Sequence, residues 1–157
     1  MAFDFDKFKE SVGNFVSESS RKIRQYTPET FSPEKKFINA IVASMALMTI
    51  ADRKVDTREV TASLDMIGQI DQISELEMTQ EAIELFEMHI DRLVPLLDVE
   101  HKWVIESAKL LGDIGRVKAY PEYIPMIKNL VDYIASADGD FSPEEQAMKQ
   151  KILDVLS

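Results

Sequence analysis

Two short acidic segments contain the residues best suited to chemistry. They read Ala51-Asp52-Arg53-Lys54-Val55-Asp56-Thr57-Arg58-Glu59 and Ala137-Asp138-Gly139-Asp140-Phe141-Ser142-Pro143-Glu144-Glu145. Each segment places an Asp directly after an Ala and a Glu seven residues further on. Carboxylates at such spacing suit a hard cation, because Ca²⁺ takes about six to eight oxygen ligands. The candidate metal ligands are Asp52, Asp56, Glu59, Asp138, Asp140 and Glu145.

A turn held by hydrogen bonds explains the same residues without a metal. In each segment the Asp that follows the Ala closes a predicted helix, where the negative end of the helix dipole disfavours a carboxylate. Backbone amides of the loop can stabilise this carboxylate by donating hydrogen bonds to it in an Asx-type turn. Asp56 with Glu59, and Ser142 with Glu145, also fit capping boxes. The residues alone leave the metal site and the turn open, and two basic residues inside the first segment make it the weaker metal candidate.

The apolar pattern predicts the elements that carry these segments. Glycine and proline are scarce, at five and six residues, and apolar residues recur at steps of three and four. This pattern predicts an all-α fold of about seven helices, forming a single domain over residues 1–157. We expect helices over about 5–26, 32–51, 57–70, 79–95 and 99–111, with two more opening at Tyr120-Pro121 and at Ser142-Pro143.

An internal repeat relates the two ends of the chain. Apolar positions 37, 38, 41, 45, 48 and 51 match positions 123, 124, 127, 131, 134 and 137 at a constant offset of 86 residues. The same offset pairs Asp52 with Asp138 and Glu59 with Glu145. We therefore expect a pseudo-symmetric bundle with two helix–loop–helix repeats, at about 33–70 and 121–156.

Composition excludes several kinds of site. The chain has a net charge of −10 and no cysteine, which excludes disulfides, thiolate zinc sites and cysteine nucleophiles. An acidic surface repels phosphate backbones, so nucleic acid is a poor partner and basic proteins are better ones. No catalytic set of nucleophile and base is readable, so we expect that the protein is not an enzyme. A carboxylate-bridged hydrolase would need two metals about 3.5–4 Å apart between the segments.

The remaining polar and amphipathic features have ordinary explanations. His89 stands near Glu87 and Asp91, as surface histidines often do, and we expect it at the surface. The predicted helix 5–26 has an aromatic-rich apolar line and a basic cluster at Arg21, Lys22 and Arg24. We expect this helix to pack on protein, with a bilayer surface as the open alternative. The N-terminus lacks a signal peptide and no window reaches about 18 apolar residues, so a cytoplasmic location follows.

The second acidic segment resembles the TerB-like tellurite-resistance family. Ala137-Asp138-Gly139-Asp140-Phe141 with Glu145 is the strongest match, and the likeness extends through Met1–Lys7 and Glu81–Phe86 over essentially the whole chain. The first segment departs from the family pattern by having Arg53 in place of Gly. The resemblance implies a seven-helix cytoplasmic protein with acidic metal-binding loops. It also implies work with other tellurite-resistance proteins, including a membrane component and Ca²⁺-binding partners.

These observations together predict a non-enzymatic tellurite-resistance and stress-response protein. It would bind a divalent metal, with Ca²⁺ as the first candidate, and act by protein interaction, free in the cytoplasm or at the inner face of the membrane. The alternative is a metal-independent, co-chaperone-like or membrane-peripheral adaptor with the same helical fold. Tellurite itself is a poor ligand for the loops because both are anionic.

Overall fold

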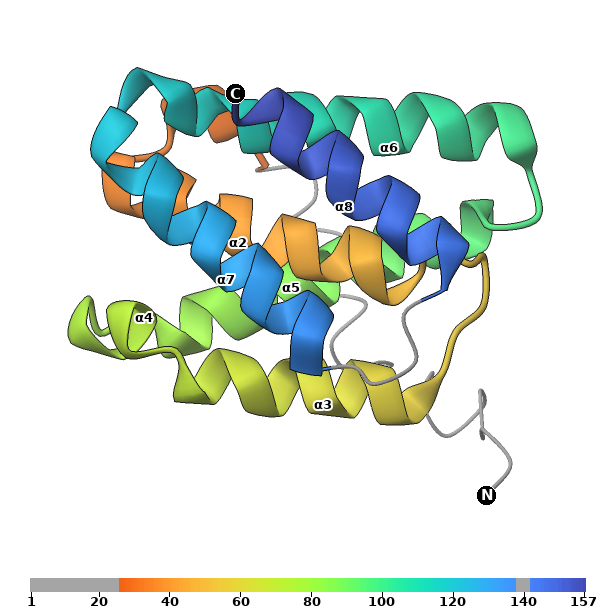
Figure 1. Ribbon diagram of the computed structural model, residues 1–157, viewed down its shortest axis with the longest axis horizontal. Helices are drawn as coiled ribbons and strands as arrows, with labels where there is room; N and C mark the ends of the chain where they lie inside the picture. The colour runs from red at the N-terminus through yellow and green to blue at the C-terminus, as the bar shows by residue number, and fades with distance from the viewer. Residues whose placement is uncertain (1–25, 138–141) are drawn as a thin grey trace.

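The structure is a computed structural model that describes residues 26–137 and 142–157, and these ranges contain helices and no strand (Figure 1). The α-helices are α2 (Pro33–Thr49), α3 (Thr57–Gln69), α4 (Asp71–Glu75), α5 (Thr79–Leu93), α6 (Glu100–Ile114), α7 (Ile124–Ala137) and α8 (Pro143–Val155). Short 3-10 helices are η1 (Pro28–Thr30), η2 (Val94–Leu96), η3 (Gly115–Ala119) and η4 (Pro121–Tyr123). The all-α prediction is confirmed, while the predicted helix 5–26 lies outside the described residues.

The helices that flank the acidic segments begin at the expected caps. Ser32 Oγ accepts a hydrogen bond from the Lys35 amide at 3.2 Å, with Pro33 in the first turn of α2. Ser142 Oγ accepts from the Glu145 amide at 3.2 Å and caps α8. Asp56 caps α3 through the amide of the second helical residue. Local sequence therefore sets these three starting points.

The largest differences from the sequence prediction concern helices α7, α4 and α6. The helix expected to open at Tyr120-Pro121 begins instead at Ile124, after the 3-10 turn η4. Pro125 supplies the reason, because proline lacks an amide donor and fits only the first turn of an α-helix. Helix α4 was not expected at all, and α6 continues three residues beyond its predicted end at Leu111, to Ile114.

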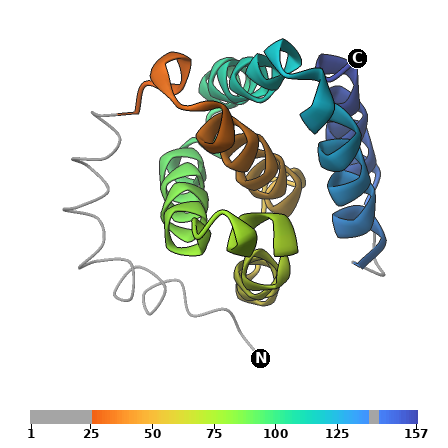
Figure 2. The ribbon, with the colours of Figure 1, turned by 90° about the vertical axis from the view of Figure 1, so that its left-hand side faces the viewer.

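Helix α2 lies at the centre of the bundle. Every residue from Phe37 to Ile50 is buried, which is the property of a helix surrounded by protein. Figure 2 looks nearly along α2, with α5, α6, α3 and the α7–α8 pair arranged around it. Burying each large side chain of this helix stabilises the fold by about 1.5–3 kcal/mol. The core is therefore organised by one helix.

The two sequence repeats have matching element bounds and unequal surroundings. The first residues of α3 and α8 are 86 positions apart in the sequence, and so are their last residues and their N-caps. The matched residues Phe37 and Tyr123 contact each other, with ring centroids 4.7 Å apart. The surroundings differ, because α2 is central and α7 is peripheral. The buried side chains of α3 are Val60, Ser63 and Ile67, and those of α8 are Glu145, Met148 and Ile152, which is one residue out of register with the offset. Superposition of the two units stays a prediction.

Candidate functional site

The first acidic segment forms a tight turn after α2. Asp52 Oδ1 accepts a hydrogen bond from the Lys54 amide at 3.1 Å, which is the geometry of an Asx turn. Arg53, the residue between them, has a φ of 63° and so lies in the left-handed region. The loop amide of Lys54 therefore stabilises the Asp52 carboxylate, as the hydrogen-bonded turn without a metal requires.

Arg53 connects this turn to α6. Its guanidinium forms a two-pronged ion pair with the Glu100 carboxylate, in which Nη2 lies 3.2 Å from Oε1. The same guanidinium lies over the Trp103 ring, with its central carbon 4.9 Å from the centroid. The hydrogen bond from Arg53 holds the pKa of Glu100 below its usual value. The turn is therefore tied to α6 through its own cation, Arg53.

Asp56 is used as a helix cap. Its Oδ1 accepts from the Arg58 amide at 2.9 Å, and its Oδ2 lies 3.5 Å from the Arg58 guanidinium. The backbone hydrogen bond is the main reason that the pKa of Asp56 is lowered. Glu59 is half-buried in the first turn of α3. Within residues 26–137 and 142–157, no group of three or more acidic or histidine side chains is arranged to hold a metal ion.

The second acidic segment is described only at its end. Asp138 and Asp140 lie outside the described residues. Glu145 is buried, with 6% of its surface exposed, and its Oε1 accepts a hydrogen bond from Ser142 Oγ at 3.2 Å. Ser142 and Glu145 thus bond to each other at the first turn of α8, where the helix dipole favours a carboxylate. A buried carboxylate therefore borders this segment.

A buried polar chain that the sequence did not reveal joins three helices. Tyr26 donates its hydroxyl hydrogen to Asp113 Oδ2 at 3.0 Å and accepts from Asn39 Nδ2 at 3.0 Å. Asn39 Oδ1 lies 2.8 Å from His89 Nε2. The prediction of a surface position for His89 is wrong, since its exposed fraction is 0%. An available signal was the polar Asn39 inside the long apolar run of residues 37–51.

The hydrogen-bond directions fix the state of His89. Because Asn39 donates through Nδ2 to Tyr26, its oxygen faces His89, and Nε2 of the ring must carry the hydrogen. The other ring nitrogen, Nδ1, is buried without a hydrogen-bond partner among the described residues. Burial and the neighbouring Arg92 lower the pKa of His89 to about 3, while burial and Asp113 raise that of Tyr26. His89 is therefore neutral near pH 7.

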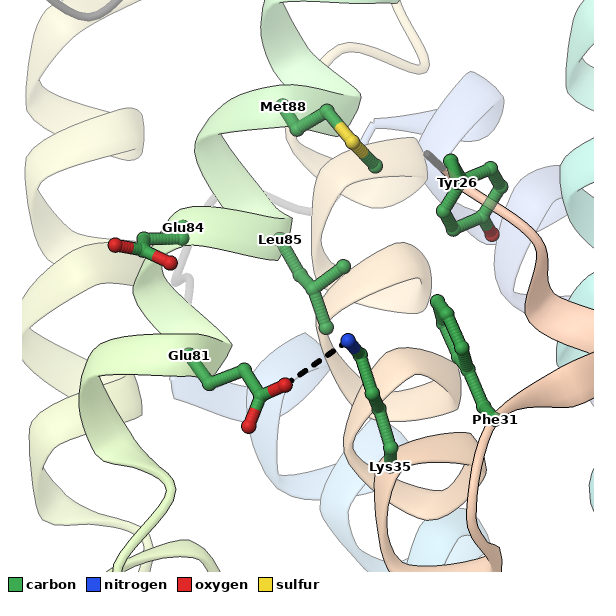
Figure 3. A pocket seen from close by; sticks show the side chains of 7 residues that line it. All are labelled: Tyr26, Phe31, Lys35, Glu81, Glu84, Leu85 and Met88. Atoms are coloured by element: carbon green, nitrogen blue, oxygen red, sulfur yellow. Dashed lines mark ion pairs between the residues drawn. The ribbon is translucent and has the colours of Figure 1, made fainter. Parts of the chain in front are cut away.

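A groove opens beside this chain, between α5 and the segment that leads into α2 (Figure 3). It has a volume of about 210 Å³. The Lys35 side chain forms an ion pair across the groove, in which Nζ lies 2.9 Å from Glu81 Oε1. Lys35 Nζ also lies 4.4 Å from the centre of the Phe31 ring. The groove is lined by Tyr26, Phe31, Lys35, Glu81, Glu84, Leu85 and Met88. It combines an apolar floor with charged edges.

Comparison with known proteins identifies the family. A family model described as tellurite resistance protein TerB matches residues 39–157. The chain belongs to the TerB family. No curated protein and no solved structure gave a match. The TerB match includes both acidic segments and confirms the resemblance that the second segment indicated.

The N-terminal part of the chain lies outside the TerB match. Residues 1–38, which include Tyr26 and the first turns of α2, precede the matched region. None of the helices in the described part of the chain is long and apolar enough to cross a bilayer.

Proposed function

We propose that this TerB protein binds a divalent cation through residues 138–145, with Ca²⁺ as the first candidate, and acts in tellurite resistance by protein interaction without catalysis. The family match supports the link to tellurite resistance. Asp138, Asp140 and Glu145 would provide the carboxylate ligands, and Asp52, Asp56 and Glu59 would form a weaker site.

The conformation of Arg53 is the observation that carries this proposal. Arg53 is left-handed, and the offset of 86 residues places Gly139 at the matching position of the second segment. Glycine adopts this conformation without steric cost. A second segment that followed the same path would therefore turn in the same way, with Asp140 instead of Lys54 as the next residue. Two positive charges of the first segment would be missing, and a metal ion would balance the carboxylates.

The proposed partners follow from the charge of the protein and from its family. With a net charge of −10, the protein would attract basic surfaces of other tellurite-resistance proteins, a membrane component among them, and would repel nucleic acid. A cytoplasmic location, with contact to the inner face of the membrane through that component, agrees with this proposal. A bound cation would reduce the local negative charge and so change the affinity for such partners.

A second candidate function is an adaptor that needs no metal. The bonds from Asp52 Oδ1 to the Lys54 amide and from Asp56 Oδ1 to the Arg58 amide favour it, because they complete the first turn without an ion. The cap that Ser142 forms on the Glu145 amide, with its side-chain bond to Glu145, would stabilise α8 in the same way. Under this alternative the acidic segments are structural, and the acidic surface alone recruits partners.

Calorimetric titration of chelator-treated protein with Ca²⁺, Mg²⁺ and Zn²⁺ separates the two candidates. The metal proposal expects saturable binding that Asp138→Asn abolishes and the matched control Asp52→Asn leaves in place. Ion at a hundredfold excess over Kd would also stabilise the native state by about 2.7 kcal/mol, which raises Tm by several degrees. If no divalent ion binds or shifts Tm, the metal site is wrong and the adaptor function stands.

A further inference from the structure

Helix α5 has an outer side, away from α2, with little exposed surface. Figure 2 shows α5 at the edge of the bundle, with no other described helix on the side away from α2. Yet no residue from Glu81 to Leu93 is exposed, whereas α6 and α8 both have exposed residues on their outer sides. Asp91 lies on this outer side and has a raised pKa because of its burial.

The groove beside α5 is a surface suited to an amphipathic helix. Four of its residues, Glu81, Glu84, Leu85 and Met88, recur at the spacing of one helix face. Figure 3 shows Leu85 and Met88 directed from α5 towards the side where Tyr26 and Phe31 lie. Met88 is only 2% exposed although it lines the groove. Leu85 and Met88 therefore form a short apolar strip along α5 that is bordered by carboxylates.

The chain itself supplies a segment of matching chemistry at this place. Tyr26 lines the groove, so residues 1–25 lead directly to its edge. The basic residues 21, 22 and 24 precede Tyr26 by two to five positions, which keeps them within roughly 18 Å of it. Helix α5 carries the acids Glu81, Glu84, Glu87 and Asp91, whose charge is opposite to that of this basic cluster.

We propose that residues 1–25 dock on the outer side of α5, with the apolar line of Phe8, Val12, Phe15 and Val16 in the groove beside Leu85 and Met88. A fifteen-residue helix over residues 8–22, which contains these four apolar residues, would be about 22 Å long, like the fifteen-residue α5. The basic cluster would lie beside the carboxylates of α5. The docking segment lies outside the TerB match, and its site on α5 is separate from the acidic segments.

A paramagnetic label tests this docking in the full chain. Because the chain has no cysteine, Ser17→Cys gives a single nitroxide site on the polar side of the segment. We expect selective broadening of the amide signals of α5 and of no signals in α8, which lies on the opposite side of α2 (Figure 2). Broadening spread evenly over the bundle, or confined to helices other than α5, would overturn the proposal.

Variants of the segment separate docking from simple tethering. Val12→Asp with Phe15→Asp should lower the docking equilibrium roughly ten- to hundredfold, because two apolar side chains lose their burial, and the broadening of α5 should fall to the tethered level. The matched control Asn14→Asp, on the polar side, should leave it unchanged. If the double variant broadens α5 as strongly as the parent does, the apolar line is not the docking face and the proposal fails.

Two further samples identify other occupants. The first sample mixes nitroxide-labelled protein at natural isotope abundance with ¹⁵N-enriched protein that carries no nitroxide. Broadening of α5 in this mixture would assign the groove to a second copy and overturn the proposal. Binding of the labelled segment to phosphatidylglycerol vesicles, with α5 unbroadened in their absence, would assign the segment to a lipid surface and overturn it as well. Neither result bears on metal binding, which titration measures separately.

Discussion

Asn39 Oδ1 lies 2.8 Å from Nε2 of His89 in the centre of the bundle, and this contact joins α2 to α5. Both residues are buried, and the amide of Asn39 also donates to Tyr26, whose hydroxyl reaches Asp113 of α6. One side chain amide therefore satisfies polar groups from two other segments. The stability of the core depends on this chain of polar contacts as well as on apolar burial.

Stability should fall with decreasing pH because His89 is buried in its neutral form. Its pKa is lowered from 6.5 to about 3, so below pH 6.5 the unfolded chain takes up a proton that the native state does not. This group alone should lower the free energy of unfolding by about 1.4 kcal/mol for each pH unit between 6.5 and 3. Urea unfolding at pH 7 and pH 5 measures the slope.

The contribution of His89 can be isolated by substitution. His89→Gln should reduce the loss between pH 7 and pH 5 by about 2 kcal/mol relative to the wild type, because the titrating ring is gone. The control His101→Gln changes an exposed histidine on α6 and should leave the slope unchanged. Equal slopes in His89→Gln and the wild type would show that His89 does not titrate in this way.

Removal of the Asn39 side chain should be costly. Asn39→Ala leaves the Tyr26 hydroxyl without a donor and His89 Nε2–H without an acceptor, so we expect a loss of about 2–4 kcal/mol in the free energy of unfolding. Asn129→Ala, at an exposed position of α7, should change stability by less than about 0.5 kcal/mol. Chemical denaturation of both variants gives the comparison, and similar stabilities would contradict the role of the polar chain.

The left-handed backbone at Arg53 should produce a stability difference between two substitutions at this position. Arg53→Gly and Arg53→Ala both lose the contacts with Glu100 and Trp103. Only the alanine variant retains a Cβ at a φ of 63°, so it should be about 1 kcal/mol less stable than the glycine variant. Urea midpoints of the two proteins provide the test, and coincident midpoints would argue against a strained turn in solution.

Conversion of the first acidic segment into the second should create a stronger cation site. In Arg53→Gly/Lys54→Asp, residues 51–54 take the same sequence as residues 137–140, and two positive charges leave the turn. Calorimetry should then record a second ion per chain, because the carboxylates lose their internal counter-charge. Arg53→Ala/Lys54→Ala removes the charges without adding a ligand, and a second ion in that control would mean that charge alone determines binding.

Features determined by neighbouring residues could be predicted from the sequence. Ser32 followed by Pro33 predicted the start of α2, and Ser142 with Glu145 predicted the N-cap of α8, because each partner lies within three residues. Pro125 carried an equally local signal, and the prediction of a helix start at Tyr120-Pro121 did not use it. The Asx turn at Asp52 was one of the two alternatives that the sequence left open, and it is a local contact as well.

Contacts between distant residues could not be predicted in this way. Arg53 and Glu100 are 47 residues apart, and Asn39 and His89 are 50 apart, so their pairing depends on how the helices pack. Neighbouring carboxylates in the sequence made His89 look exposed, although its position on α5 directs it into the bundle. Helical periodicity gives the buried face of each helix but not the helix that lies against it.

The central position of α2 has a consequence for amide hydrogen exchange. Helix α2 contacts α3, α5, α6, α7 and α8. If any of these helices dissociated completely, part of the apolar surface of α2 would be exposed to water. Its backbone amides between Ile41 and Met48 should therefore exchange with solvent only through global unfolding, at the slowest rates in the chain. The two halves related by the sequence repeat would then open as one cooperative unit, whatever their symmetry.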